Sequence, residues 1–340
     1  MIFLNFILTT FKVIIIEYLI LFAHEIAHYI SSLILGFKAS SFYLLPFNLY
    51  KKDSKFKIKI LIFKDNFITS KIHFNSIKVS SKLEYNILIK KLRIFFWVGP
   101  IFDFLIFIIL FSIGVTKIEY SYLALISLIH FSLSTLNFFN SDGKYAIGSK
   151  EDKRIAFDVV RNYTICGNGY VSNETQRILT DMHMEIAENI NLAPFDVNDL
   201  WNFLNNISFY TNSLLSYLNK DLLILHPSTF KFLSSLEEDF YNIKKYDYRQ
   251  VEKTSISLLY YFIYKKLLDK SFTPNKDSLD MIYKSLTSNY YKKIFLLYFN
   301  DETKYLKYLS DENNIPPFIS SCEGYSKLLL NLVKLYENKI

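Results

Sequence analysis

Residues 3–35 form an apolar segment that is long enough to cross a lipid bilayer, and its second half contains two histidines and a glutamate. A helix rises about 1.5 Å per residue, so this segment exceeds the roughly 30 Å hydrocarbon core and should tilt or protrude at one end. Ionisable side chains are costly in hydrocarbon. The pentapeptide His24-Glu25-Ile26-Ala27-His28 therefore indicates a function that requires these groups inside a membrane.

The two histidines of the pentapeptide lie four residues apart, so in a helix they project from one face and can share one zinc ion. A glutamate between two such ligands can act on a metal-bound water. The residues could instead be hydrogen-bonded members of a helix bundle, but two imidazoles and a carboxylate in one turn are expensive to bury without a metal. We predict that His24 and His28 are zinc ligands and that Glu25 is catalytic.

Two more apolar segments, residues 94–113 and 120–139, bring the predicted number of membrane spans to three. The first of these is interrupted by Gly99-Pro100 and by Asp103, and Gly36 is a plausible stop for the N-terminal span. The sequence alone assigns no role to Asp103. It also leaves Glu17 open, as a partner of the zinc site or as a marker of the outer end of the first span.

The region between the first two spans, residues 38–93, contains 13 Lys or Arg and 3 Asp or Glu. The alternating segments 56–60 and 71–74 predict a small antiparallel hairpin or sheet. Because basic loops stay in the cytoplasm, this loop and everything after residue 142 should be cytoplasmic, and the amino terminus should lie outside.

Charge separates the two halves of the chain. Residues 1–143 carry 15 Lys or Arg against 8 Asp or Glu, whereas residues 144–340 carry 24 of each. The whole excess of +7 thus belongs to the membrane half, which indicates membrane topology and not nucleic-acid binding. Cys166 and Cys322 lack the spacing of a thiolate metal site, and we interpret them as structural thiols.

Residues 149–340 have the pattern of a soluble all-helical domain, distinct from a membrane core over residues 1–148. Amphipathic periodicity, proline breaks and helix-start residues predict its helices. They are expected near residues 150–163, 173–191, 197–218, 228–244, 248–269, 275–299 and 323–338. The fold class is therefore mostly α, with a three-helix membrane core, a small β insertion and a soluble all-α domain.

A catalytic zinc needs a third protein ligand. Asp142 is the best candidate, because it follows the third span at its cytoplasmic end and His28 lies toward the same side of the first span. Ser141-Asp142-Gly143 could alternatively be a turn that ends a helix. The other histidines fit less well by their positions along the chain: His73, His130, His183 and His226.

The motifs taken together resemble the site-2 protease family of intramembrane zinc metalloproteases. They are an N-terminal membrane helix with HExxH, a later Gly-Pro in a membrane helix, and a final helix that ends in Asn and Asp-Gly. The resemblance covers residues 10–148 and leaves the helical C-terminal domain unexplained. It implies that His24, His28 and Asp142 bind Zn²⁺ and that Glu25 is the general base.

The resemblance also implies that Asn137 helps to hold an extended substrate strand, and that the basic region after Gly36 presents the substrate by strand addition. The sequence departs from the family pattern in three ways. No proline separates Asn137 from Asp142, so Asn140 is an alternative equivalent. Asp103 stands where the Gly-Pro helix usually carries an asparagine, and no insertion is long enough for a PDZ domain.

The function expected from these features is intramembrane zinc proteolysis of a membrane-anchored protein or peptide precursor near the cytoplasmic face. The protein would be a multi-pass protein of the cell membrane, and its heavy use of Lys, Ile, Asn, Phe and Tyr suggests an AT-rich bacterial genome. The expected partners are the substrate, the lipid bilayer and a protein bound by the helical domain.

Two alternatives stay open. One is a catalytically silent membrane scaffold or immunity-type protein of the same fold, which acts by partner binding through its helical domain. The other is a zinc peptidase that acts on soluble peptides at the membrane surface.

Overall fold

The computed structural model describes most of the chain up to residue 296. The described residues are mostly helical. They cover residues 2–44, 47–52, 55–60, 70–74, 77–115, 118–136, 141–165, 171–190, 200–218, 220–243, 248–269, 271–287, 291–292 and 295–296.

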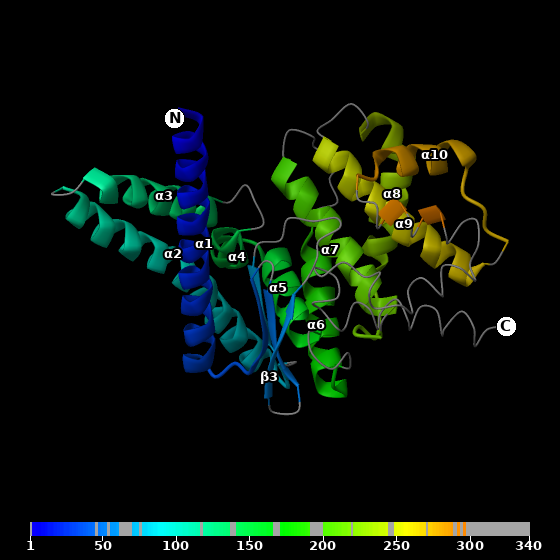
Figure 1. Cartoon of the computed structure of the whole chain (residues 1–340). Helices are drawn as coiled ribbons and strands as arrows, with labels where there is room; N and C mark the ends of the chain where they lie inside the picture. Colours follow the sequence, from blue (N-terminus) through cyan, green and yellow to red (C-terminus); the bar gives the residue numbers. More distant parts are fainter. Residues whose placement is uncertain are drawn as a thin grey trace. The chain divides into compact units, whose positions relative to one another are not determined.

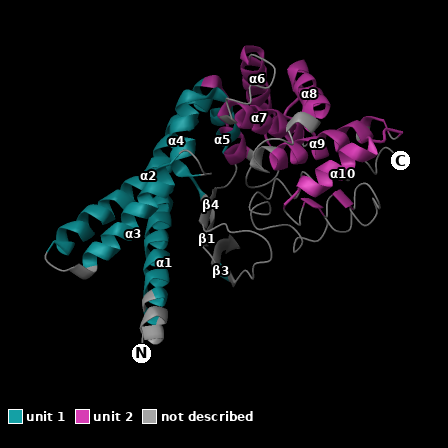
Figure 2. Cartoon of the chain, turned by 90° about the horizontal axis from the view of Figure 1, so that it is seen from above, with its two compact units in different colours: residues 1–63, 67–77, 83–159 teal, residues 64–66, 78–82, 160–340 magenta. Residues whose placement is uncertain are grey.

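The chain divides into two compact units (Figure 2). The first comprises residues 1–63, 67–77 and 83–159, and the second comprises residues 64–66, 78–82 and 160–340. The division along the helical part of the chain thus falls at residues 159–160. The expected boundary at residue 148 lies inside a helix of the first unit, α4 (Asp142–Glu151).

Three long helices make up the apolar part of the first unit: α1 (Ile2–Ile34), α2 (Lys82–Gly114) and α3 (Ile118–Thr135). Helix α2 begins 12 residues before the predicted start of the second span, and it continues through Pro100. Its first three turns are amphipathic, with Tyr85, Leu88, Ile89 and Leu92 buried along one stripe. The predicted span did not include these turns, because only one face of them is apolar and a membrane span was sought as a continuous apolar segment. Helix α3 ends at Thr135, four residues before the predicted end of the third span.

The three helices are neighbours, and successive ones run in opposite directions (Figure 1). Between α1 and α2, contacts join His24 to Asp103 and, farther along α1, the carbonyl of Leu35 to Lys91. Between α2 and α3, Ser127 donates to the carbonyl of Asp103, and Ser121 donates to that of Gly114. In both pairs, contacts at increasing residue numbers on one helix meet decreasing residue numbers on the next, so α2 runs against the chain direction of α1 and of α3.

By length and composition, residues 10–34 of α1 and the whole of α2 are long and apolar enough to cross a membrane. Their burial pattern is the reverse of that of a soluble bundle, because the buried positions of α1 include several polar side chains: His24, Glu25, His28, Ser31 and Ser32. The exposed positions of α1 are large and apolar, among them Phe11, Ile14, Leu19, Ile30, Leu33 and Ile34. A contiguous apolar exterior around a polar interior fits helices whose solvent is lipid.

The described strands between α1 and α2 form one antiparallel sheet in the order β3-β2-β1-β4. The strands are β1 (Ala39–Leu44), β2 (Phe47–Lys52), β3 (Lys55–Ile60) and β4 (Ser70–Phe74). The last strand pairs with β1 and not with β3, so that β3 and β4 are the two edges. The two alternating segments noted in the sequence lie in these edge strands.

The helices after α4 follow the amphipathic pattern of the sequence closely. They are α5 (Lys153–Ile165), α6 (Asn173–Asn189), α7 (Leu200–Leu218), α8 (Pro227–Ile243), α9 (Tyr248–Leu268) and α10 (Lys276–Ser285). The second unit has an aromatic and aliphatic core that includes Phe209, Tyr210, Leu214, Leu236, Tyr260 and Phe262. These aromatic side chains are buried, as expected for a core.

One helix of this series is shorter than predicted. Helix α10 ends at Ser285, whereas the pattern predicted one continuous helix to residue 299; after the break, residues 291–292 and 295–296 are helical again. The backbone turns extended at Leu286, and the next residue, Thr287, donates its N–H to a carboxylate oxygen of Glu252. The helix predicted at residues 323–338 lies outside the described residues.

A buried histidine joins three segments of the second unit. Nε2 of His183 accepts a hydrogen bond from the backbone N–H of His226 (3.2 Å), which places the ring proton on Nδ1. Nδ1 then donates to Oγ of Ser213 (3.1 Å), whose hydroxyl donates to the carbonyl of Phe209 (2.7 Å). Burial, with a smaller contribution from the charge of His226, lowers the pKa of His183 to about 4.

This depressed pKa makes the stability of the second unit pH-dependent. The unfolded chain protonates His183 near pH 6.5, whereas the folded chain does so only near pH 4. The contribution of His183 should be complete above pH 6.5 and fall by about 3 kcal/mol as the pH drops toward 4. The thermal unfolding midpoint of the full chain in detergent, followed by Trp201 fluorescence in a Trp97→Phe background, should therefore decrease over this window.

The matched variant is His183→Gln, which cannot titrate. Its midpoint should decrease less than that of the parent between pH 6.5 and 4. Equal decreases in the two proteins would show that His183 is not the source of the pH dependence.

Candidate metal centre

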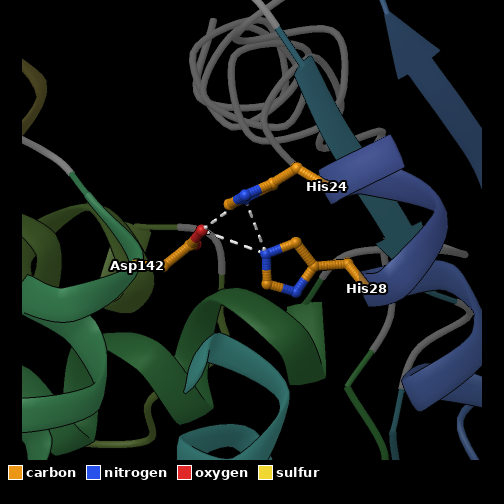
Figure 3. Close-up of side chains that lie close together, drawn as sticks. All are labelled: His24, His28 and Asp142. Atoms are coloured by element: carbon orange, nitrogen blue, oxygen red, sulfur yellow. Dashed lines mark hydrogen bonds and ion pairs between the residues drawn. The ribbon is translucent and has the colours of Figure 1, made fainter. Parts of the chain in front are cut away.

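Helix α1 directs both histidines of the pentapeptide toward one point, because residues four apart share a helix face. His24 and His28 are each 3% exposed, and their Nε2 atoms lie 3.1 Å apart. Oδ2 of Asp142 lies 3.1 Å from Nε2 of His24 and 3.0 Å from Nε2 of His28 (Figure 3). The structure thus brings the two histidines together with the third ligand that the sequence predicted, from 118 residues away.

The three atoms fit a metal better than they fit one another. The Nδ1 atom of His24 donates to Asp103, so in the neutral ring Nε2 carries a lone pair. That lone pair faces a carboxylate oxygen and a second imidazole nitrogen, which makes a cluster of electron-pair donors. Ligands about 2.0 to 2.2 Å from a tetrahedral zinc lie roughly 3.3 to 3.6 Å from each other, close to the spacing found here. Two imidazoles and a carboxylate are also a donor set that zinc commonly takes.

Asp142 reaches the histidines because it opens a helix. Ser141 is the N-cap of α4: its Oγ accepts from the backbone N–H of Lys144 (3.3 Å) and donates to the carbonyl of Leu136 (2.6 Å). The Ser-Asp-Gly sequence therefore starts a helix and does not end one. Gly143 then packs so closely on the end of α3 that an added Cβ would lie 2.7 Å from Cα of Thr135.

The far end of α4 is tied to α2. Nε of Arg93 donates to Oγ of Ser149 (3.1 Å), and its terminal nitrogen donates to the carbonyl of Ser149. A cation at a helix C-terminus also interacts favourably with the helix dipole. Both ends of the helix that carries Asp142 are thus fixed to the helices around the histidines.

Gly99 of α2 forms the wall behind the two ligand nitrogens. An added Cβ would lie 2.5 Å from Nε2 and from Cε1 of His24 and would collide with Nε2 of His28. Glycine therefore stands here because the imidazoles need the space of a side chain, and not because the backbone needs unusual dihedral angles. Pro100 follows without breaking the helix.

Asp103, one turn beyond Gly99, is completely buried and accepts from Nδ1 of His24 (2.7 Å). The same Oδ2 atom accepts from Nδ1 of His130 on α3 (2.8 Å). His130 does not join the two histidine ligands at Asp142 but lies on the other side of His24. Sequence reasoning set His130 aside as a ligand and assigned Asp103 no role; the only available signal was that both are ionisable residues in apolar segments.

Glu25 and Glu17 also lie in the polar interior of α1. Glu25 is 7% exposed and interacts electrostatically with His28. Glu17 is half-buried and lies within electrostatic reach of His130 and Asp103. Glu17 is therefore directed toward the bundle and does not simply mark the outer end of a span.

Access from solvent is uneven around the three ligand atoms. The side chains of His24 and His28 are 4% exposed, whereas that of Asp142 is 25% exposed. Burial alone would raise the pKa of the Asp142 carboxyl, but in the metal-free chain the two imidazoles, when protonated, outweigh burial and hold that pKa below its usual range. The carboxylate is ionised, as a metal ligand must be.

Two predicted positions are not placed by the structure. Asn137 and its alternative, Asn140, lie outside the described residues, so the proposed substrate contact stays a prediction. His73 lies on β4, and its side chain is also outside the described part.

One family model matches the chain, the model of peptidase family M50, and it matches residues 12–296. The matched part includes all the ligand atoms described above and extends into the second unit. Comparison with curated proteins and with solved structures gives no match.

Gly99→Ala tests whether the ligand atoms really need the space beside α2. The added methyl group would displace both imidazoles, so we expect zinc affinity to fall at least tenfold, although alanine is the better helix former. Zinc bound by the purified, detergent-solubilised chain can be measured by chelator competition. Ser112→Ala on the exposed part of the same helix is the control. Unchanged affinity in Gly99→Ala would contradict this packing.

Proposed function

We propose that this chain, which belongs to peptidase family M50, the site-2 protease family, cleaves peptide bonds of a membrane-anchored protein or peptide precursor. Proteins of this family are membrane-embedded, zinc-dependent metallopeptidases, although some members are inactive. The activity of this chain and its substrate class are our inference from the site.

The observation that supports the proposal most strongly is the convergence of three electron-pair donors beside a buried glutamate. His24 and His28 from α1 and Asp142 from α4 lie within 3.1 Å of one another. Three protein ligands leave a fourth position for water or substrate, which is the arrangement of catalytic and not of structural zinc sites.

In the proposed reaction the metal would activate water and the carboxylate would transfer its proton, as in other zinc hydrolases. A zinc ion bound by His24, His28 and Asp142 would activate water and polarise the peptide carbonyl. Glu25 accepts a proton from the attacking water and then donates it to the leaving amine. The histidines stay neutral so that Nε2 can donate its lone pair to the metal.

The location of the site supports proteolysis at a membrane boundary. Lipid-facing apolar side chains surround the polar interior of α1, while Asp142 is the most exposed of the three ligands. Water can therefore reach the site from the side where α3 ends and α4 begins. The positive-inside bias assigns this side to the cytoplasm, along with the C-terminal helices.

An extended substrate needs a partner for its backbone. The described sheet has two edge strands, β3 and β4, and neither pairs with another described strand on its outer side. We propose that one of them receives the substrate segment before cleavage, with Asn137 as a further contact. The helical second unit would then recruit the substrate or a protein partner.

The silent-scaffold alternative has the same fold and would bind a partner through the helical unit. It predicts that Glu25 has no function, whereas the peptidase proposal makes Glu25 indispensable. A peptidase that acts on soluble peptides at the surface would keep Glu25 but would cut outside the lipid segment.

Glu25→Gln should reduce cleavage by at least 10²- to 10⁴-fold, because the amide cannot accept the proton of the attacking water. The measurement is mass spectrometry of new peptide termini in membranes of cells that express the parent or the variant. New termini within or next to membrane segments should occur only with the parent. Zinc binding should persist in Glu25→Gln and be lost in His28→Ala.

The same new termini in the parent and in Glu25→Gln would overturn the proposal. Termini confined to soluble peptides would instead favour the surface peptidase.

A further inference from the structure

We propose that Asp103, held in place by His130, is a positioning residue that fixes His24 for metal binding. The inference rests on the proposed function, since it concerns the same metal centre. It assigns a role to a carboxylate and a histidine that the motif-based assignment of this site does not include.

Asp103 binds both imidazoles through a single oxygen. Its Oδ2 atom lies 2.7 Å from Nδ1 of His24 and 2.8 Å from Nδ1 of His130, and 3.4 Å from Oγ of Ser134. The other oxygen, Oδ1, has no hydrogen-bond partner among the described residues. Because the residue is 0% exposed, water does not screen these contacts.

The contact determines which nitrogen of His24 faces the metal. A carboxylate oxygen can only accept, so the proton of the neutral ring must lie on Nδ1, and Nε2 is left as the ligand. The hydrogen bond also fixes the rotation of the ring and raises the basicity of the ligand nitrogen. Nε2 is the atom that lies 3.1 Å from Asp142.

His130 holds Asp103 from α3. Its ring packs edge-on against that of His24, with centroids 5.2 Å apart, and its Nδ1 donates to the same oxygen. The main chain of Asp103 is also fixed, because its carbonyl accepts from Oγ of Ser127 (2.9 Å). Side chains of α3 thus hold the carboxylate of α2 against the histidine of α1.

The two histidine ligands are therefore supported unequally. Nδ1 of His28 is buried and has no hydrogen-bond partner among the described residues, so only its packing and the ligand-side contacts hold the ring. Phe95 lies beside it, with ring centroids 4.8 Å apart. Loss of Asp103 should consequently affect one ligand and leave the other in place.

A second metal between His24, Asp103 and His130 is the competing interpretation, because one ligand atom from each lies within 4.8 Å of the others. Such a metal would have to replace the proton on Nδ1 of His24 while Nε2 also binds zinc, which would make the ring an anionic bridge. Two ordinary N–H donors on one carboxylate account for the same distances without that charge.

The test measures metal binding and not proteolysis, in the full chain purified in detergent with Glu25→Gln present throughout. Asp103→Ala should weaken zinc by 10- to 100-fold, and Asp103→Asn should weaken it less, because the amide oxygen can still accept from His24. His130→Gln should also weaken zinc. Ser132→Ala on α3, which removes only a hydrogen bond to the carbonyl of Leu128 on the same helix, should change the affinity less than threefold.

The visible absorption bands of bound Co²⁺ provide a readout that a purely structural role would not change. They should shift in Asp103→Asn and stay in place in Ser132→Ala, with the unfolding midpoints checked in parallel. Zinc affinity and Co²⁺ bands unchanged in Asp103→Asn would overturn the inference.

If Asp103→Ala does not fold, the zinc affinity of His130→Gln, on α3, is the deciding measurement. Unchanged zinc affinity in His130→Gln would count against the positioning role of Asp103. A second equivalent of metal in the parent, lost in His130→Gln, would support the bridged alternative instead. A parent protein that binds no zinc would overturn the proposed function itself, which distinguishes that failure from a failure of Asp103 alone.

Discussion

The structure depends on one unfavourable juxtaposition, in which two imidazole nitrogens and a carboxylate oxygen meet inside helices whose exteriors are apolar. Uncompensated, these donors would destabilise the bundle, since both imidazoles have lost nearly all their hydration and their lone pairs face one another and a carboxylate. A bound cation would remove the conflict. The same cation would make the packing of α1 against α4 favourable, so that metal binding and the closure of this unit are one event.

Two glycines make the juxtaposition geometrically possible. Gly99 lets the backbone of α2 approach the imidazoles, and Gly143 lets α4 approach the end of α3. A side chain at either place would push a helix outward, and contacts of about 3 Å between ligands do not tolerate such a shift. The glycines of the Gly-Pro and Asp-Gly motifs are therefore packing requirements for the cluster formed by His24, His28 and Asp142.

Much of the helical architecture was predictable from local pattern. Each long apolar segment and each amphipathic helix of the second unit can be recognised from the pattern of its own residues. Helices α5 to α9 accordingly begin and end within three residues of the predictions. The failures are also local: the amphipathic start of α2 lacks an apolar signature, and α10 stops where Thr287 binds Glu252, a partner 35 residues away. A tertiary contact of that kind has no trace in the periodicity of the helix.

The sequence by itself determined which residues of α1 can hold a metal, because a spacing of four within a helix requires no knowledge of the rest of the fold. It also indicated Asp142, but only through the assumed order of the spans. The tertiary structure alone decided that Asp103 and His130 lie behind His24 and that Gly99 faces both ligand nitrogens. Asp103 is 79 residues from His24 and 27 residues from His130 along the chain. Side-chain packing decides which faces of the three apolar helices meet, and hydropathy carries no information about those faces.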